Sequence, residues 1–137
     1  MEKDFCKYRC LGLVWDKMIK GKIWGWTLEI FKNDNFEVHL IYVKKNYTCS
    51  EHVHHYKFNM FFIIFGELII KTWKNDYPLI DKTTIKIYEK TCTNQNEWHS
   101  FKSKKKTLAL EIYFTKSIDE DIERRNAGCK ILKKSKL

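Results

Sequence analysis

Short segments in which apolar and polar side chains alternate make up most of the chain from Trp24 onwards. The alternation is clearest over residues 36–44, where the apolar Phe36 and Val38 flank Glu37. A period of two residues is typical of β-strands that bury one face. Similar segments, rich in β-branched and aromatic residues, are found at 26–31, 51–56, 59–65, 67–73, 83–88, 97–102 and 107–114. Closely spaced strands of this kind predict an all-β fold, either a sandwich or a barrel.

Both ends of the chain differ from this pattern. Residues 1–20 form a mixed N-terminal segment, with a short helix predicted near Leu13–Ile19. Ser117 is a suitable helix N-cap because acidic residues follow it, so the C-terminal tail, 117–137, is predicted to be helical or irregular. The residues between these segments, 21–116, are predicted to form one β-domain.

The size and composition are those of one folded domain. The chain has 137 residues and a mass of 16.7 kDa, and 44% of its residues are hydrophobic, which excludes an intrinsically disordered chain. Its longest apolar run, Met60–Phe65, is far shorter than the roughly 20 residues that a membrane-spanning helix needs. The N-terminus has no apolar signal core. We therefore expect a cytoplasmic protein without a membrane partner.

The charge balance changes this picture little. The chain has 26 basic and 17 acidic residues, for a net charge of +9, and much of the excess gathers in lysine clusters at 102–106 and 130–136. Arginine, the usual reader of bases, is scarce. We therefore interpret the lysines as solvated charge and expect no nucleic-acid partner. The alternative, a nucleic-acid interface, predicts an affinity that falls steeply with salt.

The cysteines indicate a reducing compartment. Their number is odd and they contain no C-x-x-C pair: Cys6, Cys10, Cys49, Cys92 and Cys129. Free thiols are therefore expected, and none of them lies in a recognisable nucleophile motif.

The histidines carry the sharpest chemical signal. Three of the five lie within four residues, at His52, His54 and His55. Residues two apart in a strand point to the same face, so His52 and His54 are predicted to project together. Neutral imidazole binds zinc, iron, nickel and copper, and His99 is the candidate third ligand. A surface pair of histidines without a metal is the alternative that these residues leave open.

The residues around these histidines resemble the two sequence motifs of the cupin superfamily. The first motif has a His-x-His pair, an acidic residue five positions after the second His, and then six residues and a Gly. His52, His54 and Gly66 fit this motif, whereas Asn59 stands in place of the usual Glu. The second motif resembles residues 93–101, where asparagines replace the usual Pro and Gly and can adopt the same left-handed turn geometry.

The resemblance covers roughly residues 21–115, and Lys22–Trp26 is similar to the corresponding part of cupins of the sugar-phosphate isomerase type. It implies a cupin double-stranded β-helix, a jelly-roll barrel with one divalent metal ion (Zn, Mn, Fe or Ni) in its mouth. Because an amide oxygen is a weaker ligand than a carboxylate, a coordination position is left open to water or substrate. The implied ligands are His52, His54, His99 and Asn59.

Glu111 and Tyr113 are the candidate catalytic residues, because they lie two positions apart in a predicted strand and share one face. A structural or solvent-facing role for Glu111 is the alternative. Lys57 is a candidate rim charge that attracts a carboxylate or phosphate, with a solvated lysine as the equal alternative. We interpret His39 as a structural histidine and His55 as a residue outside the ligand set.

These residues and the resemblance together imply a metal-binding cupin. The most compatible activity is an isomerase or epimerase acting on a small sugar or sugar phosphate, so the expected partner is a small polar or anionic substrate. An iron-dependent dioxygenase-type cupin and a non-catalytic cupin that binds a small ligand are the alternatives, because the same histidines can serve each. The apolar residues of the N-terminal segment, among them Phe5, Leu11 and Val14, predict a homodimer.

Overall fold

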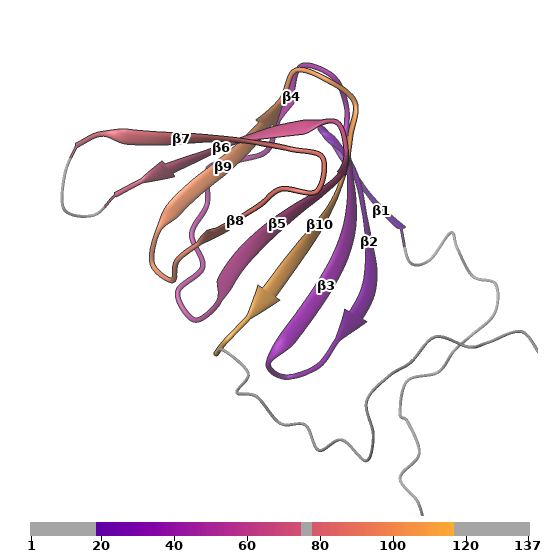
Figure 1. Cartoon of the computed structure of the whole chain (residues 1–137). Helices are drawn as coiled ribbons and strands as arrows, with labels where there is room; N and C mark the ends of the chain where they lie inside the picture. The colour runs from indigo at the N-terminus through magenta and orange to yellow at the C-terminus, as the bar shows by residue number, and fades with distance from the viewer. Residues whose placement is uncertain (1–18, 75–77, 117–137) are drawn as a thin grey trace, which may run out of the picture.

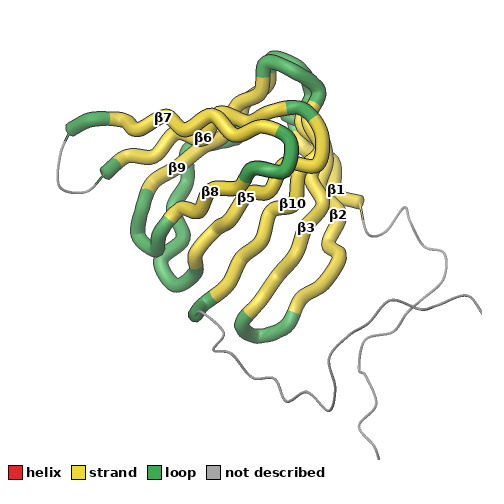
Figure 2. Tube along the Cα trace, viewed as in Figure 1, coloured by secondary structure: helices red, strands yellow, loops and turns green. Residues whose placement is uncertain are grey.

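The structure of this protein is a computed structural model that describes residues 19–74 and 78–116. The regular elements of these residues are all β-strands (Figures 1 and 2). Within the described ranges, no helix has the length and hydrophobicity that crossing a membrane requires. In chain order the strands are β1 (Ile19–Lys22), β2 (Gly25–Lys32), β3 (Phe36–Val43), β4 (Tyr47–Thr48), β5 (Phe58–Phe65), β6 (Glu67–Trp73), β7 (Ile80–Lys86), β8 (Lys90–Thr93), β9 (Trp98–Ser103) and β10 (Thr107–Phe114).

The strands form two antiparallel sheets. The larger sheet has the order β1-β2-β3-β10-β5-β8, and the smaller has the order β4-β9-β6-β7. The last strand in sequence, β10, therefore lies between β3 and β5, and the chain crosses repeatedly from one sheet to the other (Figure 1). This topology is a jelly-roll, which confirms the all-β double-stranded β-helix expected from the sequence.

The hydrophobic core lies between the sheets and takes side chains from both. Alternate residues of β3, β5, β6 and β10 are buried, as the period of two predicted. The buried apolar side chains are Ile41, Val43, Cys49, Phe61, Ile63, Leu68, Ile70, Ile85, Phe101 and Ala109.

Inward positions of the larger sheet change from apolar to polar along the strands. In β10, Ala109 is fully buried in the core, and Glu111, two positions later, is also buried but polar. Glu111 lies opposite His39 of β3, and Tyr113 lies opposite Asn59 of β5 in the antiparallel register. The fold thus aligns polar side chains from three strands at one end of the barrel.

The tight turn between β5 and β6 explains the glycine of the first motif. Gly66 has φ +84°, and a Cβ atom added there would lie 2.4 Å from the carbonyl oxygen of Lys106. Both the left-handed backbone and the close approach of a neighbouring strand exclude a larger residue.

Two strand predictions were wrong in detail. Residues 51–56 form a loop with one isolated bridge at His52, where the sequence predicted a regular strand. The strand predicted at 83–88 instead spans β7, and Tyr88 beyond it has φ +65°, a left-handed turn conformation that ends the extended backbone. The short strands β4 and β8 were not predicted.

The predicted terminal elements fall mostly outside the described residues. The helix predicted near Leu13–Ile19 and the tail 117–137 lie there, except that Ile19 itself begins the strand β1.

Candidate metal centre

Three histidines from two separate segments converge at one end of the barrel. His52 and His54 lie in the loop that precedes β5, and His99 lies in β9 of the smaller sheet. One ring nitrogen of each lies within 4.8 Å of the others, and the ring centres are 4.5–5.3 Å apart. Three imidazoles at this separation can bind one metal ion.

Backbone hydrogen bonds hold the loop against β9. The amide of His52 donates to the carbonyl of His99 at 3.0 Å, and the amide of His99 donates back to His52 at 2.9 Å. Farther along the loop, the amide of Asn96 donates to the carbonyl of His54 at 2.8 Å. Pairing of this loop with a segment that is distant in sequence therefore brings the two histidines together. The sequence had predicted that a regular strand would do so.

The turn before His99 is also fixed. Asn96 has φ +60°, the left-handed geometry predicted for an asparagine in place of Gly. The buried Glu97 accepts a hydrogen bond from the amide of Asn94 at 2.9 Å and forms an ion pair with Lys74. This turn sets the position at which β9 begins and so the position of His99.

Hydrogen bonds to backbone carbonyls orient two of the rings. Nδ1 of His52 donates to the carbonyl of Ser50 at 2.8 Å, and Nδ1 of His99 donates to the carbonyl of Glu97 at 2.9 Å. These bonds place the lone pair of each ring on Nε2, which is the usual arrangement behind metal-binding histidines. That atom of His99 also lies 3.4 Å from Nδ2 of Asn59, within hydrogen-bond distance. Nε2 of His54 is buried without a hydrogen-bond partner among the described residues. A buried ring nitrogen without a partner, beside the Nε2 atoms of two oriented rings, fits a metal ion.

Burial favours the neutral form of two of these histidines, His54 and His99. Desolvation lowers the pKa of His54 to about 4, with a further contribution from the neighbouring rings of His52 and His99. Desolvation also lowers the pKa of His99, although its bond to the carbonyl of Glu97 opposes that shift. Because neutral imidazole is the ligating form, the lowered pKa values favour metal binding at neutral pH.

Asn59 lies at the edge of the cluster and is fully buried. Its Nδ2 atom donates to a carboxylate oxygen of Glu111 at 3.1 Å and lies 3.4 Å from Nε2 of His99. In this orientation the amide presents its nitrogen to the histidines, and its Oδ1 atom is buried without a partner among the described residues. Ligation through Oδ1 requires rotation of the amide and loss of the bond to Glu111.

The two predicted catalytic residues lie beside the cluster. Glu111 is 8% exposed and interacts with both Asn59 and the hydroxyl of Tyr113. The ring centre of Tyr113 is 5.0 Å from that of His54. Burial, reinforced by the carboxylate of Glu111, raises the pKa of the phenol, so Tyr113 stays protonated and acts as a donor.

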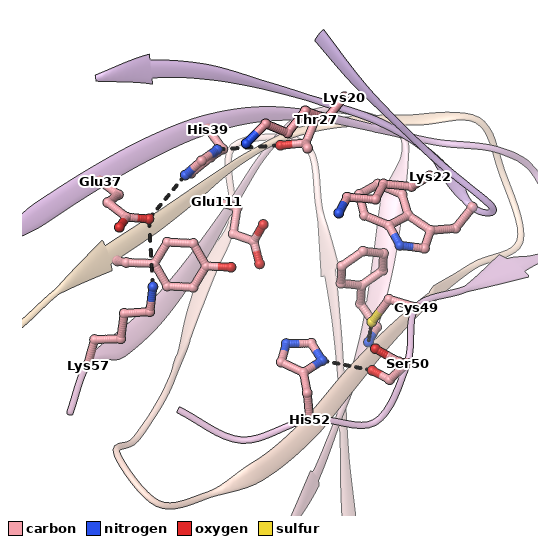
Figure 3. Close-up of a pocket in the computed structure, with 13 residues that line it drawn as sticks. Lys20, Lys22, Thr27, Glu37, His39, Cys49, Ser50, His52, Lys57 and Glu111 are labelled. Atoms are coloured by element: carbon pink, nitrogen blue, oxygen red, sulfur yellow. Dashed lines mark hydrogen bonds and ion pairs between the residues drawn. The ribbon is translucent and has the colours of Figure 1, made fainter. Parts of the chain in front are cut away.

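A cavity of about 430 Å³ opens next to these residues (Figure 3). Its volume is in the range of small-molecule sites. Its lining includes His52 of the cluster, Glu111 and Tyr113 of β10, Trp24, and Lys20 and Lys22 of β1.

An ionic network forms part of the cavity wall. Glu37 accepts a hydrogen bond from Nε2 of His39 at 3.3 Å and lies 3.6 Å from Nζ of Lys57 and 3.2 Å from Nζ of Lys32. Partial burial opposes ionisation of Glu37, but its hydrogen bonds with His39 and Lys32 and the charge of Lys57 hold its pKa below the usual range. Lys57 also lies over the ring of Tyr113, 3.9 Å from its centre.

Sequence reasoning missed several of these residues. Glu37 shares the inward parity of His39, and this alternation was the signal that could have placed it in the cavity. Lys20 and Lys22 precede the region where the alternation becomes regular, so nothing in the pattern assigned them to the site. His55 lies outside the cluster, as predicted, and its Nδ1 atom is 2.9 Å from Oδ1 of Asn96.

The cysteines of the described residues, Cys49 and Cys92, are free thiols. Cys49 lines the cavity, and its sulfur accepts a hydrogen bond from the amide of Phe101 at 3.1 Å. Burial raises the pKa of this thiol to about 12, so it is not a nucleophile at neutral pH.

No protein-family model matches the sequence, and a comparison with curated proteins gives no match. Solved structures, however, share the fold. KdgF from Halomonas sp. has a TM-score of 0.62 at 6% identity, over 72% of this chain and 86% of that chain. The cupin domain of Schizosaccharomyces pombe Cnp3 has a TM-score of 0.61 at 11% identity, over 72% of this chain and 68% of that chain.

A larger enzyme with Mn(II) centres, the oxalate decarboxylase of Bacillus subtilis, also matches. The TM-score is 0.64 at 11% identity, over 74% of this chain and 28% of that chain, so this chain spans less than a third of that enzyme. Similarity at such low identity establishes the fold alone. This chain therefore has the fold of cupin domains, a double-stranded β-helix, with three histidines gathered at one end.

Proposed function

We propose that this protein binds one divalent metal ion through His52, His54 and His99. In this proposal it acts on a small polar substrate, a sugar or sugar phosphate, as an isomerase or epimerase. The observation that carries the proposal is the donor set itself: one ring nitrogen of each of three histidines lies within 4.8 Å of the others, and Nε2 of His54 is buried without a partner among the described residues. The Mn(II) centres of an enzyme with the same fold support a divalent ion. Asn59 remains a proposed fourth ligand.

His52, His54 and His99 would hold the divalent ion, which would supply Lewis acidity toward a carbonyl or hydroxyl oxygen of a substrate. The protein supplies the proton transfer. Glu111 is a carboxylate that faces the cavity beside the cluster, so it can accept a proton from the carbon next to a polarised carbonyl. In the orientation that the structure shows, Tyr113 of the same strand and Asn59 of the neighbouring β5 hold this carboxylate in place.

The test of the metal site is elemental mass spectrometry of protein purified without a His-tag. We expect about one equivalent of metal per chain, and its loss in a His52→Ala/His54→Ala/His99→Ala variant. His55→Ala is the matched control, because this histidine is adjacent in sequence but lies outside the cluster. An unloaded wild-type protein, even after incubation with Mn, Zn, Fe and Ni salts, would refute the site.

The test of the activity is solvent proton exchange. Sugars and sugar phosphates are incubated in D₂O with the metal-loaded protein, and deuterium incorporation at carbon is followed by NMR. We expect Glu111→Gln to retain the metal and to lose the exchange by a factor of at least about 100. Absence of exchange and turnover with every substrate and ion would contradict the isomerase.

The two alternatives give different outcomes. Substrate-dependent oxygen consumption with added iron would identify a dioxygenase-type cupin. Binding of a small ligand without any turnover would identify a non-catalytic cupin.

A further inference from the structure

Two lysines of β1 face the cavity beside the histidine cluster. Lys20 and Lys22 are two residues apart, so they project from the same side of the strand, and both line the cavity (Figure 3). β1 is the edge strand of the larger sheet and pairs only with β2 within the described residues. The pair of ammonium groups is therefore presented by a single strand at the border of the sheet.

The other charged groups of the cavity wall already have partners within the protein. Lys57 is balanced by Glu37 and lies over the ring of Tyr113. The carboxylate of Glu111 is occupied by Asn59 and by the hydroxyl of Tyr113. The carboxylates of the cavity wall, Glu37 and Glu111, therefore interact with other side chains of the wall.

Lys20 and Lys22 differ from Lys57 in this respect. No carboxylate of the described residues lies within ion-pair distance of either. A cavity wall with two uncompensated ammonium groups, next to a candidate cation site, attracts an anion.

We propose that Lys20 and Lys22 bind the oxyanion group, a carboxylate or a phosphate, of the small molecule whose reacting end lies at the histidine cluster. This assignment rests on the proposed function, and it narrows the substrate class to acidic or phosphorylated compounds. Two ammonium groups on one strand contact different oxygens of the same oxyanion, which orients the molecule along the cavity toward His52.

Edge strands also carry lysines for another reason, because a charge at a sheet edge prevents pairing with other chains. That role needs the charge at the edge and makes no use of the cavity. A binding measurement distinguishes the two roles, because only lysines that form a subsite bind an anion in the cavity.

The experiment is titration calorimetry at constant ionic strength with inorganic phosphate and, separately, acetate, on the full-length protein before and after metal loading. We expect saturable binding, weakened about tenfold or more in Lys20→Ala/Lys22→Ala, because a charge-assisted hydrogen bond contributes about that factor. The matched control is Lys104→Ala/Lys106→Ala, which removes the same charge with the same spacing at residues that do not line this cavity. The control is expected to bind within about twofold of the wild type.

Comparison of the two titrations distinguishes the two substrate classes. Tighter binding of phosphate indicates a phosphorylated substrate, and tighter binding of acetate indicates a substrate with a carboxylate. Absence of saturable binding of either anion, unchanged affinity in Lys20→Ala/Lys22→Ala, or an equal loss in the control would overturn the subsite. Metal content, measured on the same samples, tests the proposed function separately. Anion binding without metal uptake would refute the metal site and leave the anion subsite standing.

Discussion

At the scale of single residues, the carboxylate of Glu111 explains why a neutral side chain stands at position 59. The family motif that this sequence resembles has a carboxylate at position 59, whereas here that side chain is a neutral amide that donates to Glu111 at 3.1 Å. Both residues are buried. Two carboxylates this close in a buried site cannot both be ionised, so the acid on β10 is compatible only with a neutral partner on β5. The negative charge beside the histidines therefore lies on β10 and not on β5.

This reasoning predicts a coupled pair of substitutions. Asn59→Glu alone is expected to destabilise the fold by roughly 2–4 kcal/mol, because it buries a second acid against the first. Asn59→Glu/Glu111→Gln restores one donor and one acid, and should recover most of that loss. Urea unfolding of the single and double variants measures the coupling. Simple additivity of the two effects would show that the pair does not share one charge.

Glu37 predicts a pH dependence of stability. Its pKa is lower in the folded protein than in the unfolded chain, so its ionised form stabilises the fold. The contribution is complete above the unfolded pKa of about 4.3 and is lost as the pH falls through the folded value. Glu37→Gln should therefore unfold at lower urea than the wild type at pH 6, and the difference should shrink at pH 3. The exposed Glu51→Gln is the control, and an equal difference at both pH values would contradict the prediction.

At the scale of elements, the start of β2 depends on a glycine. Gly25 has φ +156°, and a Cβ atom there would lie 1.8 Å from the carbonyl oxygen of Tyr42 in β3. The backbones of the two strands meet too closely for any side chain. Since Gly25 also pairs with Lys22, this close approach sets the position of β1 over the cavity.

Two glycines of this hairpin provide a matched test. Gly25→Ala is expected to destabilise the protein by more than about 2 kcal/mol, because the overlap can be relieved only by moving the backbone. Gly21→Ala, with no atom within 4 Å of the added Cβ, should change stability little. The midpoint of urea unfolding measures both, and equal midpoints for the two variants would refute the strand contact.

The loop at residues 51–56 shows why element prediction failed where it did. Its sequence predicted a strand, but among the described residues its backbone–backbone hydrogen bonds join only His52 with His99 and His54 with Asn96. Whether such a segment extends a ladder depends on the partner strand that tertiary structure places beside it. The prediction that His52 and His54 lie together survived, because both backbones are held against the β9 segment.

At the scale of the whole molecule, the homodimer expected from the sequence stays a prediction. Light scattering at micromolar concentration should give twice the chain mass of 16.7 kDa. The edge strands and the exposed apolar side chains near them, such as Leu79 and Ile80, leave surface that a second copy can cover. A mass of one chain under these conditions would contradict the dimer.

The sequence by itself determined the class of fold and the identity of the histidines. Alternation with a period of two requires strands with one buried face, and His52, His54 and His99 stand at motif positions that a short stretch of chain defines. Those signals are local, so they can be read without knowing which strands pair.

Only the tertiary structure decided what surrounds the histidines. β10 enters between β3 and β5, and this pairing of segments far apart in sequence brings Glu111 to Asn59 and aligns it with His39. The edge strand β1 places Lys20 at the same cavity, although nothing in its local sequence marks it. Contacts between distant strands depend on strand order and register, which emerge only when both faces of the barrel are packed together.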